Sequence, residues 1–256
     1  MDALVSVVLP FRNSPFLARA IQSILDQTYA NFELLLINNN SDAESAAVAK
    51  SYEGRDHRIK YLHEARAGVA HAMNRGIQEA SGNYIARMDA DDYSFPNRLE
   101  NQVAMLERNP VLSAVAGKVE YEGEKENRGF QLFVDWQNQL VAEQDIYNSQ
   151  FVELPLVNPT LMFRSEVFKD RLYRQGDFPE DYEFFLYLMS IDVCVGKSPE
   201  CVLKWTDSSN RLSRTDVRYS RDAFYLCKTP YLVEWLKKNN PFFPKVWIWG
   251  GGKVAR

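Results

Sequence analysis

The ten residues Asn83-Tyr84-Ile85-Ala86-Arg87-Met88-Asp89-Ala90-Asp91-Asp92 lead a mostly apolar run directly into three carboxylates, with no lysine between them. Such a run is typical of a buried strand, whereas clustered aspartates repel one another and favour water or a cation. Carboxylate oxygens at the end of a strand suit Mg²⁺ or Mn²⁺. The stretch therefore indicates a divalent-cation site, and a solvated turn that only closes the strand is the alternative.

The composition of the 256 residues narrows the class of protein. The hydrophobic share is 46% and the charged share 25%, as in ordinary globular proteins, and the length fits one large domain or one domain with an appendage. A net charge of −4 gives no general basic surface, so we expect no nucleic-acid partner. No apolar run approaches the ~20 residues that span a bilayer, and residues 1–4 lack the basic start of a secretory signal.

The cysteines indicate the redox state of the compartment in which the protein works. Cys194, Cys201 and Cys227 have no metal-ligand spacing and leave one unpaired in any disulfide scheme. We therefore expect three buried free thiols in a reducing, cytoplasmic compartment.

Apolar strands alternate with amphipathic helices through the first half. Strands are expected over Val5–Phe11, Phe32–Ile37, Ile59–Leu62 and Tyr84–Met88, and helices from Ser14-Pro15, after Asp42, from Gly68 and from Pro96. This alternation predicts an α/β fold whose mostly parallel central sheet has helices on both faces. Ligands bind beyond the carboxyl ends of such strands. We therefore expect Arg12-Asn13, Asn38–Asp42 and Asp89–Asp92 on one rim.

The pattern is looser in the second half. A strand is expected over Ser113–Tyr121, an exposed loop over Glu122–Arg128, a strand over Asn158–Arg164, a helix capped by Pro179-Glu180-Asp181, and short strands over Val193–Val195 and Val202–Trp205. A long helix over about 216–238 follows, which Pro230 should break or bend. The stretch 246–253 predicts a strand entering a glycine turn, and hence a chain truncated before a further domain.

The ordered set of motifs resembles the nucleotide-sugar-dependent glycosyltransferases of family 2, inverting enzymes with the GT-A (Rossmann-like) fold. The matching segments are Val5–Asn13, Gln27–Tyr29, Asn38–Asp42, Gly68–Ala70, Asn74–Gly76, Ala80–Ile85, Asp89–Asp92, Asn158–Arg164, Glu180–Glu183, Trp205 and Asn210–Arg214. The resemblance implies a GT-A domain over residues 1–215, with a nucleotide-binding half over about 1–112 and an acceptor-binding half over 113–215. Residues 216–256 form a helical C-terminal extension.

The resemblance also implies the roles of the acidic residues. Asp89-Ala90-Asp91 matches the family's DxD motif, which holds Mn²⁺ or Mg²⁺ on the diphosphate of the donor. Asp91 is the expected direct ligand, while Asp89 contacts ribose or the hydrated metal. Glu180-Asp181 matches the second acidic motif, with Asp181 as the catalytic base and Glu180 beside the donor. Helix capping is the alternative for this pair.

Other residues match positions where the family binds the nucleotide sugar. Pro10, Phe11 and Asn13 are expected at the nucleotide base, Gly68 and Asn74 with Gly76 near the donor, and Arg211 and Arg214 at the diphosphate. Each role has an alternative without a ligand. Pro10 and Phe11 could only pack in the core, Gly76 could only terminate a helix, and Arg211 and Arg214 could lie on a solvated loop. Asn39 stands where the family usually has an acid, but its carbonyl can still accept from uracil, so a UDP-sugar is the expected donor.

The implied activity is metal-dependent transfer of a hexosyl or N-acetylhexosaminyl group to a saccharide or lipid-linked acceptor in bacterial surface polysaccharide synthesis. The alternatives are a non-catalytic nucleotide- or carbohydrate-binding module and a sugar-nucleotide pyrophosphorylase. A pyrophosphorylase needs a glycine-rich loop after the first strand, and Leu9–Pro15 has no glycine. The C-terminal helix carries Lys228, Lys237 and Lys238 among aromatic residues. It could lie on the inner face of the membrane, with docking on the main domain as the alternative.

Overall fold

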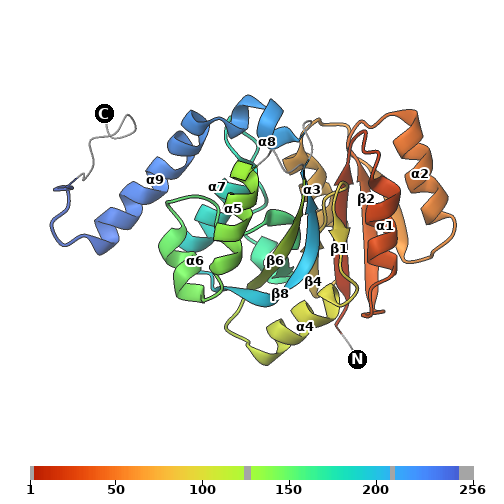
Figure 1. Ribbon diagram of the computed structural model, residues 1–256, viewed down its shortest axis with the longest axis horizontal. Coiled ribbons are helices and arrows are strands. Elements are labelled where there is room, and N and C mark those ends of the chain that lie inside the picture. The colour runs from red at the N-terminus through yellow and green to blue at the C-terminus, as the bar shows by residue number, and fades with distance from the viewer. Residues whose placement is uncertain (1–2, 124–127, 208–210, 248–256) are drawn as a thin grey trace.

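The computed structural model describes residues 3–123, 128–207 and 211–247, in which helices pack on both faces of a central sheet (Figure 1). The strands are β1 (Val5–Phe11), β2 (Phe32–Asn38), β3 (Ile59–His63), β4 (Tyr84–Arg87), β5 (Tyr93–Ser94), β6 (Ala114–Glu122), β7 (Met162–Arg164) and β8 (Val195–Thr206). The α-helices are α1 (Leu17–Leu25), α2 (Ala43–Glu53), α3 (Val69–Glu79), α4 (Arg98–Arg108), α5 (Arg128–Gln139), α6 (Glu143–Ser149), α7 (Glu180–Ser190), α8 (Leu212–Thr215) and α9 (Arg221–Asn239). The described residues also form the 3₁₀ turns η1 (Asn158–Thr160), η2 (Ser165–Phe168) and η3 (Val217–Tyr219).

Within the described residues the strands form an eight-stranded sheet in the order β3-β2-β1-β4-β7-β6-β8-β5. The first four of these strands are parallel, as the alternation predicts, and β6 is parallel to β8. Strands β7 and β5 run antiparallel to their neighbours, which makes the sheet mixed but mostly parallel. Because β1 and β2 pair in register from Val5 with Phe32 to Phe11 with Asn38, their carboxyl ends lie side by side.

Alternating residues of β1 divide the core between the two faces of the sheet. Val7 and Leu9 belong to one apolar cluster with helices α1 and α4, while Val8 belongs to the other with α3 and α7. The expected apolar stripe of α1 is confirmed, since Leu17, Ile21 and Ile24 are fully buried. Helix α3 approaches β1 closely at Gly76, where a Cβ would meet Cγ1 of Val8 at 2.3 Å. Gly76 therefore lies within α3 and does not terminate it.

Several expected boundaries are wrong. Helix α1 begins at Leu17, because the Ser14 hydroxyl donates to the Ala90 carbonyl (2.9 Å) and does not cap a helix. In the expected strand over Asn158–Arg164, the first three residues form η1, with proline fixing its start. The two short strands expected after α7 are one strand, β8. Helices α5 and α6 and strand β5 were not predicted.

The cysteine expectation is partly wrong. Cys227 is buried and Cys194 is half-buried, but Cys201 is exposed. The register of β8 against β6 shifts between Gly117 and Lys118, so the strand bulges outward just before Cys201. The exposed thiol follows from that bulge.

Helix α9 docks on the main domain, as the docking alternative predicts, and Figure 1 shows it at the end of the molecule opposite α2. The ring of Phe224 packs on Tyr182 of α7 with centroids 5.4 Å apart, and the indole N–H of Trp235 donates to the Tyr147 hydroxyl (2.8 Å). Pro230 lies inside a continuous helix and does not break it. Of the expected strand and turn over 246–253, residues 248–253 lie outside the described residues, and Val246 and Trp247 are not in a strand. None of the described helices is long and apolar enough to cross a membrane.

Candidate active site

The three turns expected on one rim are linked by hydrogen bonds. The Asn13 main-chain N–H donates to the Ser41 hydroxyl (2.8 Å), and the Asn13 side-chain carbonyl accepts from the Asp42 N–H (2.7 Å). Asn13 adopts a φ of 50°, a left-handed conformation that asparagine tolerates. The bond from Ser14 to Ala90 joins the same turns to the aspartate-rich turn. Asn13 therefore ties the β1 and β2 ends together at the predicted rim.

Asn39 fixes the loop that follows β3. Its amide nitrogen donates to the carbonyls of Glu64 (3.1 Å) and Arg66 (2.7 Å), and its carbonyl accepts from the Gly68 N–H (2.8 Å). An aspartate could accept from Gly68 but could not donate to the two carbonyls. The amide therefore explains why this position is not acidic, and one lone pair of its carbonyl is left for a ligand.

The other residues expected near the nucleotide differ in their burial. Phe11 is buried and packs on Tyr61 with ring centroids 6.4 Å apart, so its ring lies in the core beneath the rim. Pro10 is half-buried and pairs with Ile37 in the sheet. The burial of Phe11 fits the packing alternative, and its place at the nucleotide base stays a prediction.

Gly68 and Asn74 connect α3 to the segment before α7. Gly68 has a φ of +126°, which a side chain would strain, and a Cβ there would meet Oε1 of Gln175 at 3.1 Å. The Asn74 amide donates to the Tyr173 carbonyl (2.8 Å), and the Asn74 carbonyl accepts from the Tyr173 N–H (3.0 Å). Asn74 thus fixes a segment that the sequence places about 100 residues away, and Gly68 lies close to the same segment.

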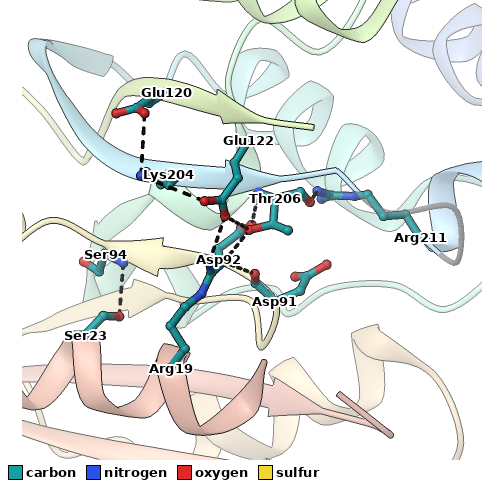
Figure 2. Close-up of polar contacts among 10 residues, drawn as sticks. All are labelled: Arg19, Ser23, Asp91, Asp92, Ser94, Glu120, Glu122, Lys204, Thr206 and Arg211. Carbon is teal, nitrogen blue, oxygen red and sulfur yellow. Dashed lines mark hydrogen bonds and ion pairs between the residues drawn. The ribbon is translucent and has the colours of Figure 1, made fainter. Parts of the chain in front are cut away.

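The three aspartates after β4 have different partners. Asp89 accepts from Nε of Arg87 (2.9 Å), and the fully buried Asp92 accepts from the Thr206 N–H (2.9 Å). The main-chain carbonyl of Asp91 accepts from Nη2 of Arg19 (3.0 Å), and Figure 2 shows its carboxylate pointing away from that contact. Among the described residues, no other residue donates a hydrogen bond to the Asp91 carboxylate. Oδ2 of Asp92 also has no hydrogen-bond partner among the described residues, but Asp92 is fully buried, so Asp91 is the carboxylate left for a ligand.

The negative charge of the aspartates is compensated more fully than the sequence suggests. Burial raises the pKa of Asp91 and raises that of Asp92 well above its usual range, while Arg211 opposes both shifts. Beneath them Arg98 is 1% exposed and donates to the Arg87 carbonyl (2.7 Å). The stretch lacks lysine, but arginines from β4 and α4 supply positive charge from within the core.

The second acidic pair opens α7. Glu180 is buried and accepts from the Tyr219 hydroxyl of η3 (2.6 Å). Asp181 is half-buried and accepts from the N–H of Tyr182 (2.7 Å), a contact within the first turn of the helix. Burial, and then repulsion by Glu180, raises the pKa of Asp181 to about 7, although Arg87 opposes the shift. A pKa near neutrality suits a group that must accept a proton.

The two acidic clusters meet at Arg87. The buried guanidinium bonds Asp89 and interacts electrostatically with Glu180 and Asp181, and these carboxylates raise its pKa. Asp89 in turn contributes to the raised pKa of Asp181. The structure thus brings together acids that are about 90 residues apart in the sequence, and Arg87 was not among the expected site residues. A charged residue inside an apolar strand is the sequence signal that marks it.

The two expected phosphate-binding arginines follow β8 and already have protein partners. The Arg211 guanidinium lies over the Trp205 ring, 4.0 Å from its centroid, and donates to the Thr206 carbonyl. Arg214 pairs with Asp207 (2.6 Å) and lies over Phe130. Asn210, which belongs to the same motif, lies outside the described residues. Of the two, Arg211 is the one that interacts with the carboxylates of Asp91 and Asp92.

The carboxylates fit a divalent cation only in part. Asp91 offers both oxygens and Asp89 one oxygen that Arg87 does not use, and such hard ligands suit Mg²⁺ or Mn²⁺. In the part of the chain that the structure describes, no three His, Cys, Asp or Glu side chains converge on one ion. The protein therefore supplies an incomplete ligand set, which a diphosphate and water would complete.

Comparison with solved structures defines the class. The chain resembles S. aureus TarS in complex with UDP-GlcNAc, with a TM-score of 0.69 and 16% identity over 91% of this chain and 66% of that one. It also resembles the mannosyltransferase PcManGT from Pyrobaculum calidifontis in complex with GDP-Man and Mn²⁺, with a TM-score of 0.62 and 18% identity over 91% of this chain and 63% of that one. These likenesses confirm the expected GT-A fold.

The family follows from the sequence comparisons. Residues 6–172 match the model of glycosyl transferase family 2, and the chain belongs to that family of nucleotide-sugar glycosyltransferases. It is 31% identical to an uncharacterized glycosyltransferase of Haemophilus influenzae over 82% of this chain and 67% of the relative. It is also 29% identical to the O-antigen biosynthesis glycosyltransferase WbnJ of Escherichia coli, over 93% of this chain and 91% of the relative. The chain thus spans about two thirds of the length of some relatives and nearly all of others.

Proposed function

We propose that the chain transfers a hexosyl or N-acetylhexosaminyl group from a UDP-sugar to a hydroxyl of a saccharide or lipid-linked acceptor, with inversion at the anomeric carbon. The observation that carries this proposal is that the buried Arg87 bonds Asp89 and also interacts electrostatically with Asp181. A donor held at the aspartate-rich turn would then have its sugar within reach of a second acid. This is the arrangement that a single displacement requires.

The donor would bind along the rim. Asn13 and Asn39 would hold the base and ribose, with Pro10 forming the edge of that site and Phe11 supporting it from the core. Asn39 favours uridine because its carbonyl keeps one lone pair for a ring N–H. Gly68 and Asn74 would shape the backbone around the sugar. Arg211 would contact the diphosphate, and Arg214 could do so only by leaving Asp207.

Asp91, together with Asp89, would hold Mn²⁺ or Mg²⁺. The cation would neutralise the diphosphate and stabilise the negative charge on the leaving group. A diphosphate beside uncompensated carboxylates would be repelled by ~1–4 kcal/mol for each charge pair at 4 Å. PcManGT, which shares the fold, was determined with GDP-Man and Mn²⁺, and this supports the cation here.

Asp181 would act as the general base. As the acceptor oxygen forms its bond to the anomeric carbon, the bond from that carbon to the diphosphate oxygen breaks, and the acceptor proton passes to the Asp181 carboxylate. Glu180 would remain bound to Tyr219 beside the donor. Such a base contributes about 10²–10⁴-fold in rate.

We further propose a role in bacterial surface polysaccharide synthesis, at the cytoplasmic face of the membrane. Similarity to WbnJ supports the first part. The outer side of the C-terminal extension supports the second, because Leu226 is 75% exposed and Trp247 97% exposed near Lys245. Such residues suit peripheral contact with anionic lipid. Sedimentation with anionic vesicles, compared with a variant carrying Leu226→Ser and Trp247→Ser, tests this contact.

A donor screen tests the central proposal. The purified protein is incubated with common UDP-, GDP- and dTDP-sugars and Mn²⁺, and release of the nucleoside diphosphate is measured, with chelator as control. We expect release from a UDP-sugar only when the metal is present. Isothermal titration with nucleoside diphosphates, with and without Mn²⁺, identifies the alternatives. Absence of metal-dependent binding would favour a non-catalytic module, and formation of pyrophosphate from a nucleoside triphosphate would favour a pyrophosphorylase.

A further inference from the structure

Arg87 is a buried cation whose hydrogen-bonding capacity is only partly used. It is 5% exposed at the end of β4, where its Nε donates to Asp89 (2.9 Å). Its Nη1 is buried and has no hydrogen-bond partner among the described residues. Leaving a donor of a buried guanidinium unpaired costs free energy, so such a group calls for a functional explanation.

A second buried polar group lies close by. The Tyr173 hydroxyl has no well-aligned hydrogen bond among the described residues, but it lies near Arg87, whose charge and side-chain hydrogen bond oppose the rise in the Tyr173 pKa that burial causes. The backbone of Tyr173 is fixed by the two hydrogen bonds from Asn74. Both groups therefore belong to a rigid part of the fold next to the start of α7.

Several titratable or charged groups interact with Asp181, and they come from different elements. They are Arg87 of β4, Asp89 of the following turn, Tyr173, Glu180 of α7, Tyr219 of η3 and Cys227 of α9. Within the described part of the chain, Arg87 is the cation of this set. Its charge, together with the hydrogen bond from the Tyr182 N–H, therefore favours the ionised form of Asp181 against burial and against its acidic neighbours.

We propose that Arg87 is a positioning residue that links the metal-binding turn to the general base, holding Asp89 through Nε and stabilising the ionised carboxylate of Asp181 with its buried positive charge. The planar guanidinium can serve both acids at once because its donors point along two edges. This inference rests on the proposed role of Asp181 as the base. It assigns Arg87 no contact with the reacting atoms.

The test measures the protonation of the Asp181 carboxyl directly. Carbon NMR titration of labelled aspartates, in protein without donor or metal, gives its pKa, and the signal is assigned with Asp181→Asn. We expect Arg87→Met to raise this pKa by about 1 or more. Asp89→Asn, which keeps the side-chain shape, should lower it by roughly 0.5, because a negative neighbour is removed and Arg87 is freed.

Two further variants separate charge from geometry. Arg87→Lys keeps the charge, so the pKa of Asp181 should stay close to that of the unaltered protein, while binding of UDP with Mn²⁺ weakens about tenfold because Asp89 loses its oriented partner. Arg171→Met is the matched control, since Arg171 is a partly buried arginine that pairs with Glu183 of the same helix. It should leave the Asp181 titration unchanged.

The outcomes distinguish this inference from the proposed function. If Arg87→Met does not fold, Asp89→Asn carries the test alone. An Asp181 pKa that is unchanged in Asp89→Asn, or in a folded Arg87→Met variant, overturns the Arg87 link. Full sugar transfer by Asp181→Asn would instead overturn the role of Asp181 itself.

Discussion

The aspartate-rich turn after β4 and the acidic pair at the start of α7 are both acidic clusters, but the protein satisfies them differently. In the turn, Asp92 accepts from the backbone of Thr206 and Asp89 from Arg87, which leaves Asp91. In the pair, Glu180 accepts from Tyr219, whereas among the described residues the Asp181 carboxylate accepts a hydrogen bond only from the adjacent Tyr182 N–H. Each cluster thus combines anchored carboxylates with one that remains available. The available ones are those for which we propose ligand binding and chemistry.

The largest effect should come from Asp181→Asn. This change keeps the shape of the side chain but removes the proton acceptor, so sugar transfer should fall at least ~10²-fold while UDP binding stays nearly intact. Transfer rates and titration calorimetry on the same preparation check both parts. Undiminished transfer would place the base elsewhere.

Asp91 and Asp92 should respond in opposite ways, although they are neighbours in the sequence. Asp91→Ala should weaken Mn²⁺-dependent UDP binding by at least about tenfold, because the free carboxylate of the turn is lost. Asp92→Ala should leave that affinity nearly unchanged in the folded protein but lower the free energy of unfolding by ~1–3 kcal/mol, because the buried Thr206 N–H loses its acceptor. Calorimetry and denaturant unfolding measure the two effects. Equal loss of binding in both variants would contradict the distinction.

The pH dependence of transfer should reflect the raised pKa of Asp181. Because its pKa is raised to about 7, the carboxylate is protonated as the pH falls, and a protonated base cannot accept a proton. We therefore expect kcat/KM to be highest above pH 7 and to fall about tenfold per pH unit at lower pH. A profile between pH 5 and 9 tests this. A flat profile down to pH 5 would mean that no group with a raised pKa limits the reaction.

Gly76 and Gly54 give a similar comparison for the packing of the backbone. Gly76→Ala would force a Cβ to within 2.3 Å of Val8, so the free energy of unfolding should fall by ~1–3 kcal/mol. Gly54 is the matched control, since a Cβ there has ordinary contacts at 3.7 Å and the residue has a φ of −68°. Gly54→Ala should change stability by less than ~1 kcal/mol, in the stabilising direction. Equal effects at the two sites would argue against the close approach of α3 to β1.

Much of the parallel half of the fold could be predicted from the sequence because short stretches of sequence there show the hydrophobic pattern of each strand and helix. Strands of four to seven mostly apolar residues alternate there with amphipathic helices, and parallel pairing then brings the turns after β1, β2 and β4 to one edge. The second half of the fold was harder to predict from the sequence. Strands β5 and β7 have only two and three residues, which is too short for a hydrophobic period to show.

The candidate site also has a part that the sequence predicts and a part that it does not. The positions of Asp91 and Asp181 in the chain could be taken from motifs, but their partners could not. Tyr219 reaches Glu180 across 39 residues, and Thr206 reaches Asp92 across 114. Contacts over such separations depend on the packing of the whole domain and leave no local pattern. Arg87 stood within the most informative stretch, yet its role becomes visible only when both acidic clusters surround it.

A crystal structure with UDP and Mn²⁺ tests the central claim most directly. We expect Mn²⁺ on the Asp91 carboxylate, the diphosphate bound to the ion, and the Asp181 carboxylate facing the same pocket from α7. Mn²⁺ and diphosphate bound away from Asp91, or an Asp181 carboxylate turned to another surface, would contradict the account.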